Sequence, residues 1–557
     1  MRHLLFSKRL QVLRREGLAV VLALAWMSGL AQTRPPVATV GPYSIEGTVV
    51  DAVSGEPLRR ASVAALAQAD SHTVKTAETG SDGRFALERL PAGKYQLTAS
   101  KRGFRTAFYL EHEEFSTAIV TGPDQETTGL TFRLMPGAVL HGVITGDGGD
   151  PVERARVMLF QPPRSHASPG AGERIAQVDS ATTDDTGAYE FNGLAAGDYL
   201  LAVVAEPWFA LNRSSTRKRA KVGPASDQAA ALDVAYPVTF FDSTTDEAAA
   251  SRIQLANGHR VEADINLHAV PALRLDVALP QKREGASPSA TLRQTIFGIE
   301  ASTQMMIQDS GAATAEFTGV APGHYEIVQG DPPRLGELDA TASQLIDATF
   351  GVPGFSVSGL IRNASGSAAP EDAAATLVPL EGARRQAPLQ ATAMGGAFRF
   401  PTVPQGNWEL WIESGGVQLP ILSLASAGRL LAGNRVTVKG GALSLVVTLN
   451  RGGTRIEGFA RKEGKGAAGA MVVLVPKDPN NLRWMVRRDQ SDSDGSFSLR
   501  DVAPGQYKVV AIEDGWDLDW ARTGGLSRYL QQGIDVTVTG SSAKLIQLSA
   551  PVPAQAH

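Results

Sequence analysis

Alternating apolar and polar positions recur along the chain and predict β-strands. The pattern is clear at residues 45–49, and it returns at 140–144, 357–361 and 456–460, each time with a glycine at the centre. Alternation with a period of two is typical of a strand that has one buried face. A central glycine indicates a bulge or the close approach of a neighbouring backbone.

A second pattern follows each of these strands further along the chain. Its clearest copy is DGRFAL at residues 82–87 followed by LPAGKYQL at 90–97. Glycine accepts the positive φ of a tight turn and proline fixes φ in the next one, so the pattern predicts two turns. We interpret the flanked strands as a β-hairpin and expect Phe85, Phe398 and Phe497 in cores. The other copies are 185–199, a weaker one at 315–327, 395–408 and 494–507.

A third strand-like element ends most units, at residues 130–134, 263–267, 445–449 and 544–548. Together the three elements predict an all-β chain, a tandem array of about five β-sandwich domains that each hold their own core. The predicted domains are 42–135, 136–268 with an inserted loop at 206–251, a degenerate unit at 270–351, 353–450 and 453–549, followed by a tail at 550–557.

The beginning of the chain has the features of an export signal. Basic residues between Arg2 and Arg15 precede an apolar run at 18–30, and small residues follow at Gly29 and Ala31. We interpret residues 1–31 as a cleaved signal peptide, with a retained anchor as the alternative. The protein is therefore expected to be exported, to the periplasm, the cell surface or the extracellular space, with no transmembrane segment in the mature chain.

Charge and cysteine content exclude several function classes. The 53 Lys and Arg residues nearly balance the 57 Asp and Glu residues, so no global basic field favours nucleic acid. The chain has no cysteine, which excludes disulfides, a thiol nucleophile and cysteine-based zinc sites. The basic cluster at residues 213–221 is interpreted as a solvated loop, with a contact to a polyanion as the alternative.

Few residues have the spacing of a catalytic site. His259 and Glu262 match a zinc-binding His-x-x-Glu pair, with His268 and His324 nearby, but they lie in a strand-like stretch. Strand positions three apart point to opposite faces, so we expect surface residues there. The sequence contains neither a Gly-x-Ser-x-Gly elbow nor a phosphate-binding loop. We therefore expect no enzyme activity, no cofactor and no metal centre.

An acidic run in the last unit has the spacing of a calcium loop. It starts at Gln490, contains Asp492 and Asp494, and continues to Asp501. The same Asp-Gly turn occurs in units that lack the other acids. A plain turn and a calcium site therefore both remain open.

Clustered aromatic residues are the better indication of binding. Sugar sites use exposed aromatic faces against pyranose rings, with nearby carboxylates for the hydroxyl groups. The alternative is that these rings cap the end of a sandwich core. The candidate ligand-binding residues are Trp516, Asp517, Asp519 and Trp520 in the last unit, and Trp208 and Phe209 at the matching place in the second.

The complete repeat resembles the carboxypeptidase regulatory-like domain and the collagen-binding B-type repeats of bacterial surface proteins. The resemblance includes a middle element at residues 57–63 and 151–157. It implies Ig-like, transthyretin-like (prealbumin-like) sandwiches within a wider carbohydrate-binding-like group, as in exported proteins of acidobacteria. In that family the domain is an accessory without catalytic residues.

These observations lead to a functional expectation. We expect a non-enzymatic exported protein for binding, adhesion or scaffolding at the cell envelope. Its partner would be a polysaccharide or an envelope or extracellular protein, with carbohydrate binding as the finer hypothesis. The alternative is an accessory subunit that acts in trans with an envelope enzyme or an outer-membrane transporter.

Overall fold

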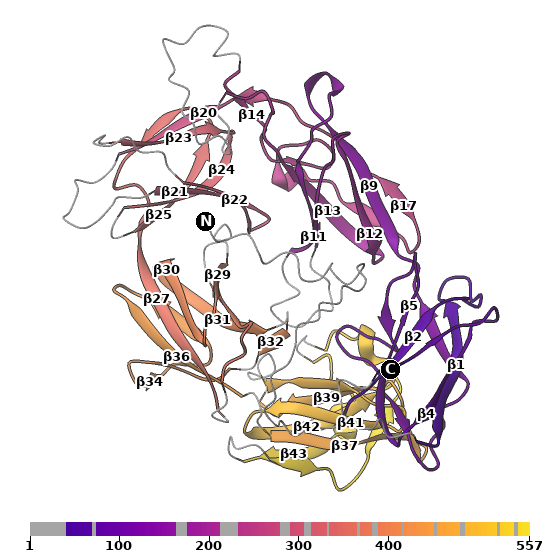
Figure 1. Cartoon of the computed structure of the whole chain (residues 1–557). Helices are drawn as coiled ribbons and strands as arrows, with labels where there is room; N and C mark the ends of the chain where they lie inside the picture. The colour runs from indigo at the N-terminus through magenta and orange to yellow at the C-terminus, as the bar shows by residue number, and fades with distance from the viewer. Residues whose placement is uncertain are drawn as a thin grey trace, which may run out of the picture. The chain divides into compact units, whose positions relative to one another are not determined.

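The computed structural model of the chain is built from β-strands and short 3-10 helices within the part that it describes (Figure 1). It describes residues 41–69, 74–162, 175–211, 232–278, 290–305, 314–330, 333–364, 368–380, 388–414, 417–419, 421–450, 454–478, 485–520, 524–539 and 544–557. The predicted signal peptide and the basic cluster at 213–221 lie outside these residues. Within these ranges, no helix has the length and apolarity needed to span a bilayer.

Five groups of strands, which we call repeats 1 to 5, follow one another along the chain. Repeat 1 contains β1 (Tyr43–Asp51), β2 (Ser62–Ala67), β3 (Val74–Glu78), β4 (Arg84–Leu90), β5 (Gly93–Ser100), β6 (Ala107–Phe108), β7 (Ile119–Thr121) and β8 (Leu130–Leu134). Repeat 2 contains β9 (Ala138–Thr145), η1 (Asp147–Gly149), β10 (Arg156–Gln161), β11 (Ala176–Thr182), β12 (Ala188–Leu194), β13 (Gly197–Val204), β14 (Val234–Ala235), β15 (Thr239–Phe240), η2 (Glu247–Ala249), β16 (Ile253–Leu255), β17 (Arg260–Glu262), β18 (Ile265–Asn266) and β19 (Val270–Pro271).

The remaining strands follow in the same order. Repeat 3 contains β20 (Leu273–Ala278), β21 (Ala290–Ile296), β22 (Ile299–Met305), β23 (Thr314–Val320), β24 (Gly323–Gln329), β25 (Arg334–Ala340) and β26 (Gln344–Ile346). Repeat 4 contains β27 (Val352–Asn363), β28 (Ala374–Pro379), β29 (Leu389–Thr392), β30 (Ala397–Pro404), β31 (Gly406–Ser414), β32 (Val417–Leu419), β33 (Ile421–Ser426), β34 (Arg429–Leu430), β35 (Arg435–Val438) and β36 (Leu443–Leu449). Repeat 5 contains β37 (Thr454–Lys462), β38 (Lys465–Gly466), β39 (Met471–Pro476), β40 (Arg487–Gln490), β41 (Ser496–Val502), β42 (Gly505–Ile512), η4 (Gly515–Asp517), η5 (Leu530–Gln532), β43 (Ile534–Val538), β44 (Leu545–Gln547) and β45 (Val552–Gln555).

Repeat 1 consists of two sheets that share one apolar core. One sheet has the order β4-β1-β8, and the other has the order β3-β2-β5-β6 with β7 also paired to β5. Ile45 and Phe85 of the first sheet belong to the same buried cluster as Val63 and Leu97 of the second. Two sheets packed over one core form a β-sandwich, which confirms the predicted fold class.

The first strand of each repeat pairs in the same way. It is antiparallel to the strand that follows the glycine-containing turn, and parallel to a strand near the end of the repeat. The pairs are β4 and β8 on β1, β12 and β17 on β9, β23 and β26 on β20, β30 and β36 on β27, and β41 and β44 on β37. The repeated sequence pattern is therefore a repeated pattern of strand pairing.

The glycine at the centre of the first strand makes room for its neighbours. A Cβ atom at Gly47 would lie 2.5 Å from the carbonyl oxygen of Leu130, and one at Gly359 would lie 2.1 Å from the Phe398 ring. The register between β1 and β4 shifts between Tyr43 and Ile45, away from Gly47. Close approach of the neighbours, and not a bulge, therefore explains this glycine.

The predicted hairpin across the Pro-x-Gly turn is wrong. In repeat 1, β4 pairs with β1, whereas β5 pairs with β2 in the opposite sheet. Repeat 5 does the same, since β41 pairs with β37 and β42 pairs with β39. The turn is therefore an arch that carries the chain from one sheet to the other. Turn residues specify a reversal of direction, but pairing with strands distant in sequence decides which sheet each strand joins.

A buried aromatic residue anchors each arch. The ring that follows the Pro-x-Gly turn donates a hydrogen bond to the carbonyl oxygen four residues earlier. The donor–acceptor pairs are Tyr95–Pro91 (3.0 Å), Tyr199–Ala195 (2.9 Å), Tyr325–Ala321 (2.8 Å), Trp408–Pro404 (3.2 Å) and Tyr507–Ala503 (2.6 Å). The polar end of each ring is thus satisfied while its apolar body fills the core. Trp408 replaces the tyrosine because the indole N–H serves the same purpose.

The predicted core phenylalanines are buried. Phe85 is 5% exposed, Phe398 is 3% exposed and Phe497 is 2% exposed. The alternation that predicted them holds because each lies on a strand with one face toward its core.

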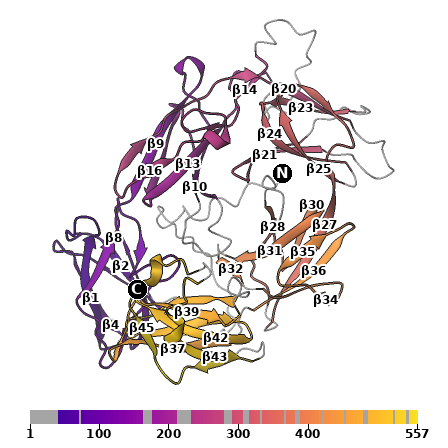
Figure 2. The same ribbon diagram turned by 180° about the vertical axis from the view of Figure 1, so that it is seen from behind.

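Two segments that the sequence indicates as a loop or a tail contain strands. Within the insertion at 206–251, β15 pairs with β13 and Phe240 is buried. In the segment 550–557, β45 (Figure 2) runs parallel to both β37 and β42. Its residue Val552 is fully buried. Strands this short show no periodicity, so only their long-range pairing reveals them.

Candidate functional site

The two tryptophans predicted as a sugar platform in repeat 5 are buried. Trp516 lies in η4 and is 7% exposed, and Trp520 is 3% exposed. Both pack in a cluster with Val473 and Val510, and the Trp516 indole N–H donates to the Gly469 carbonyl at 3.0 Å. Their rings therefore present no open face to a pyranose, and the alternative of a hydrophobic cap describes them.

The other candidate residues lie at the surface. Asp517 and Asp519, beside these tryptophans, are exposed. In repeat 2, Trp208 is 75% exposed, and its ring meets Phe209 edge to face with centroids 5.7 Å apart. Within the described residues, no contact joins this aromatic pair to the tryptophans of repeat 5. The structure therefore separates the two predicted groups, and of the two it leaves the ring of Trp208 exposed.

The cluster around Trp516 and Trp520 is covered by a loop of repeat 1. The His112 ring stacks on Trp516 with centroids 5.1 Å apart and planes 6° apart, and the Phe115 centroid lies 5.4 Å from that of Trp516. The Arg488 guanidinium lies 4.4 Å from the Trp520 centroid. We call this contact between repeats 1 and 5 the seam.

The acidic run with the spacing of a calcium loop forms the centre of the seam. The Asp492 carboxylate accepts a hydrogen bond from the Ala118 backbone at 3.0 Å and pairs with the Lys94 ammonium at 2.6 Å. The Ser493 backbone donates to the Ala118 carbonyl at 2.9 Å, and its hydroxyl accepts from the Val120 backbone at 2.8 Å. This turn therefore extends the edge of repeat 1 at β7.

Gln490 and Arg488 extend the seam toward the aromatic cluster. The Gln490 amide donates to the Leu110 carbonyl at 2.5 Å and to the Thr117 hydroxyl at 2.7 Å. Arg488, whose side chain is 4% exposed, pairs with Glu113 at 2.6 Å. A buried arginine needs such a partner, since an unpaired buried charge costs several kcal/mol.

The same contacts bear on the calcium hypothesis. Asp492 is engaged by repeat 1, and the Asp494 carboxylate accepts from the Ser496 backbone at 2.9 Å and from its hydroxyl at 2.5 Å. Asp501 is used through its backbone carbonyl, which accepts from Asn450 at 2.8 Å. Across the described ranges, no group of three or more His, Asp or Glu side chains is placed to hold a metal ion. The described contacts match the turn interpretation.

Burial raises the pKa of two carboxyls at the seam. It raises the pKa of Asp489 to about 6, against hydrogen bonds from the Ser498 and Gln490 backbones that lower it. Burial also raises the pKa of Asp492, and the hydrogen bond and charge of Lys94 oppose that rise. Burial therefore favours the neutral form of both carboxyls more than water does.

A cavity of about 300 Å³ opens on the seam, and we call it the seam cavity. Both repeats line it: Gln68, Lys94, Phe115 and Ser116 from repeat 1, and Arg488, Asp489, Gln490, Asp492, Ser498 and Arg500 from repeat 5. Sequence analysis missed this site because its two walls are far apart in the chain. The run of polar residues before Gly495 gave no distinguishing signal, because residues 182–186 before Gly187 are polar as well.

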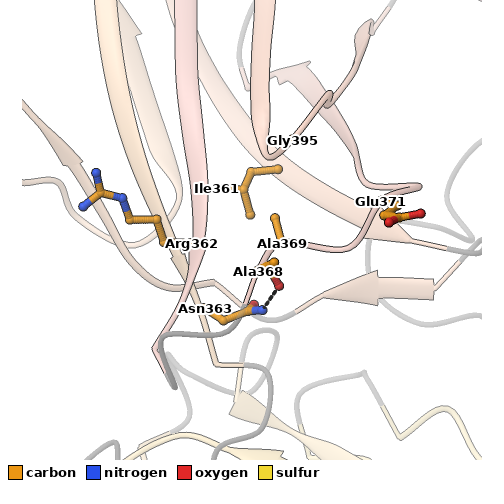
Figure 3. Close-up of a pocket in the computed structure, with 7 residues that line it drawn as sticks. All are labelled: Ile361, Arg362, Asn363, Ala368, Ala369, Glu371 and Gly395. Carbon is orange, nitrogen blue, oxygen red and sulfur yellow. Dashed lines mark hydrogen bonds between the residues drawn. The ribbon is translucent and has the colours of Figure 1, made fainter.

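A larger cavity of about 610 Å³ lies in repeat 4 (Figure 3). Its charged residues, Arg362 and Glu371, lie on opposite sides, and Ile361 and Ala369 lie between them. The Asn363 amide donates to the Ala368 carbonyl at 2.5 Å. No charged groups converge here, so this cavity has less of the character of a specific site than the seam cavity.

The His-x-x-Glu pair lies where the sequence predicts it, at a strand. Glu262 ends β17, His259 directly precedes that strand, and both side chains are exposed. His268 instead pairs with Asp147 at 2.9 Å, and His324 pairs with Asp339 at 2.7 Å. These histidines are therefore spread over different surface contacts.

Comparison with known proteins supports a family for repeat 1. No curated protein matches the chain. Similar solved structures include the Bacillus anthracis TIE protein (11% identity, 75% of this chain, 76% of that chain, TM-score 0.18), the minor pilin GBS52 of Streptococcus agalactiae (13%, 41%, 97%, 0.20) and the major pilin subunit BcpA of Bacillus cereus (11%, 56%, 99%, 0.13). These identities and TM-scores are too low to carry an argument about function.

The family model of the carboxypeptidase regulatory-like domain matches residues 44–135, a range that contains both sheets of repeat 1 except the first residue of β1. The match agrees with the motif from which the resemblance was inferred. Residues 44–135 are therefore similar to a carboxypeptidase regulatory-like domain.

Proposed function

We propose that the chain is a non-enzymatic exported protein that binds or scaffolds at the cell envelope. The observation that carries this proposal is the use of its recurrent residues. The motif phenylalanines fill cores, the motif tyrosines anchor arches, and the Asp-Gly turns connect strands. The residues that repeat thus build a framework, and function is left to features that single repeats add to it.

Carbohydrate is the ligand class we favour for the exposed aromatic pair in repeat 2. Trp208 presents most of its indole to solvent, and Phe209 supports it edge to face. An exposed indole offers a flat apolar surface that matches the apolar face of a pyranose ring. A large aromatic side chain that is exposed to water is also a feature of surfaces that bind another molecule, such as a polymer at the envelope.

A polysaccharide screen tests this proposal. Protein from Gln32 onward would be compared with a Trp208→Ala, Phe209→Ala double variant, and with Met394→Ala as a matched control, since Met394 is 82% exposed in repeat 4. We expect binding by the parent and the control but not by the double variant. Binding that persists in the double variant would remove repeat 2 as the site.

Two further outcomes would change the proposed class. Hydrolysis of a polymer by the purified protein, abolished by a point mutation, would show that it is an enzyme. Co-purification with a membrane protein from envelope extracts, without polysaccharide binding, would favour the accessory-subunit alternative.

A further inference from the structure

The seam cavity is built from groups that can still form hydrogen bonds. The Ser498 hydroxyl is buried and has no hydrogen-bond partner. Among the described residues, neither the side-chain amide of Gln68 nor the Arg500 guanidinium has a hydrogen bond or an ion pair, and both side chains are exposed at the cavity. A buried hydroxyl without a partner costs free energy, so a ligand that supplies one gains affinity.

Of the cations among the described lining residues, one has no ion pair with another described residue. Lys94 is paired with Asp492, and Arg488 is paired with Glu113. Arg500 remains, near the carboxyl of Asp489, which accepts a hydrogen bond from the Ser498 backbone at 2.6 Å. A guanidinium forms its strongest contacts with a planar carboxylate through two parallel hydrogen bonds.

The size and the surface of the cavity restrict the ligand further. At about 300 Å³, it lies at the lower end of the range for small-molecule sites, which suits a single sugar residue. Phe115 supplies apolar surface on the wall of repeat 1, whereas Asp489, Ser498 and Gln68 supply donors and acceptors for hydroxyl groups. This mixture is typical of sites for polyhydroxylated ligands.

We propose that the seam cavity binds a carboxylated sugar residue, with Arg500 on its carboxylate, Asp489, Ser498 and Gln68 on its hydroxyl groups, and Phe115 against its ring. The inference rests on the proposed envelope-binding function and names a second site and a ligand class for it. The walls of the cavity come from repeats 1 and 5, so the ligand binds only while the two repeats are in contact. Binding therefore stabilises the seam.

Isothermal titration of the full mature chain with D-glucuronate, and separately with D-glucose, tests this site. We expect the parent to bind glucuronate. Arg500→Ala should raise Kd about tenfold or more, since a charge-assisted hydrogen bond is lost. Ser498→Ala and Gln68→Ala should each raise Kd less. Arg399→Ala is the matched control, because Arg399 is an exposed arginine on the Phe-x-Phe strand of repeat 4, and it should leave Kd unchanged.

The outcomes separate this inference from the proposed function. Glucuronate binding that Arg500→Ala leaves intact but the Trp208→Ala, Phe209→Ala variant abolishes would overturn the seam site and support repeat 2. Equal binding of glucose and glucuronate would overturn the carboxylate assignment. Absence of glucuronate binding would overturn the inference, while the polysaccharide screen would still decide the proposed function. Arg500 and Gln68 are exposed, so their variants are expected to fold.

Discussion

The same turn occurs in repeats 2 and 5, and its acidic residue is used in opposite ways. In both turns the first residue donates to the carbonyl of the fifth, from Asp184 to Ala188 at 3.1 Å and from Asp492 to Ser496 at 2.8 Å. The Asp184 carboxylate accepts from the Thr186 and Ala188 backbones, so it caps its own turn. The Asp492 carboxylate is instead held by Lys94 and the Ala118 backbone of repeat 1.

The consequence is an opposite shift in pKa for equivalent carboxyls. The hydrogen bond from the Thr186 hydroxyl, followed by those from the Ala188 and Thr186 backbones, lowers the pKa of exposed Asp184. Burial raises the pKa of Asp492 despite Lys94. Local sequence thus determines the shape of the turn, whereas the surface that covers it determines its chemistry.

The largest expected effect comes from the core that supports each turn. Truncation of Phe497 to Ala should lower the free energy of unfolding by about 3–5 kcal/mol, because the cavity left in a packed core is only partly refilled. Phe398→Ala in repeat 4 should cost a similar amount. Hydrogen exchange should show the loss in repeat 4 and at the β25–β27 pairing with repeat 3 for Phe398→Ala, but in repeats 1 and 5 for Phe497→Ala. Loss of protection that extends to the same repeats in both variants would contradict this difference.

The next largest effect separates the two predicted aromatic sites. Trp516→Ala removes a buried ring from the seam and should cost about 3 kcal/mol, whereas Trp208→Ala removes an exposed ring and should change stability by less than about 0.5 kcal/mol. Denaturant unfolding followed by circular dichroism measures both. A stable Trp516→Ala variant would show that the seam contributes little to repeat 5.

Removal of the acidic residue should reproduce the difference between the turns. Asp492→Ala leaves the Ala118 N–H without its acceptor and Lys94 without its ion pair, and it should cost about 1–3 kcal/mol. Asp184→Ala, at an exposed turn, should cost less. Asp492→Asn is the control, because its amide oxygen can still accept from Ala118, and it should fall between the two. Equal losses from Asp184→Ala and Asp492→Ala would remove the special role of the turn in repeat 5.

The pH dependence should run in opposite directions in the two repeats. The folded pKa of Asp489, about 6, lies above its value of about 3.9 in an unfolded chain, so the folded state binds the extra proton. Between about pH 7 and pH 5, this group should make repeat 5 more stable as the pH falls. Asp492 repels the Asp489 charge and Arg500 attracts it, so both contribute to the slope.

Asp184 supplies the contrast and Asp489→Asn the control. The pKa of Asp184 is lowered, so its stabilisation is present above about pH 4 and is lost as the pH falls through the folded pKa. Denaturant unfolding at pH 7 and pH 5 should show the gain in repeat 5 for the parent, and a flatter response for Asp489→Asn. An unchanged slope in that variant would assign the effect to another group.

The smallest expected effect is that of calcium. Since Asp492 and Asp494 are engaged by Lys94, Ala118 and Ser496, we expect millimolar Ca²⁺ to leave Tm unchanged. A rise in Tm that Asp494→Asn abolishes would instead restore the calcium interpretation. Magnesium at the same concentration controls for ionic strength.

The short-range pattern of the sequence was sufficient to predict much of the fold. Alternation predicted the first strands and the buried phenylalanines, and the glycine-containing turns predicted where the chain reverses. These features depend on neighbours within a few residues, through φ preferences and the side to which each residue points. The exposure of Trp208 agrees with the expectation of an accessible aromatic ring. The burial of Trp516 does not follow from local spacing, because residues of repeat 1 cover it.

Long-range pairing decided what the pattern could not. The strands of the expected hairpin joined opposite sheets because β1 and β2, which are distant in sequence, are their partners. The strand β45 formed in an expected tail for the same reason.

The sequence by itself determined a chain of β-sandwich repeats, their core residues and their turns, because each depends on local spacing. The tertiary structure alone decided that a turn of repeat 5 contacts repeat 1 and that Trp516 and Trp520 are buried. It also decided that a cavity lies between repeats 1 and 5. Lys94 and Asp492 are 398 residues apart, and their contact depends on the packing of two surfaces. No periodicity within either repeat encodes such a contact.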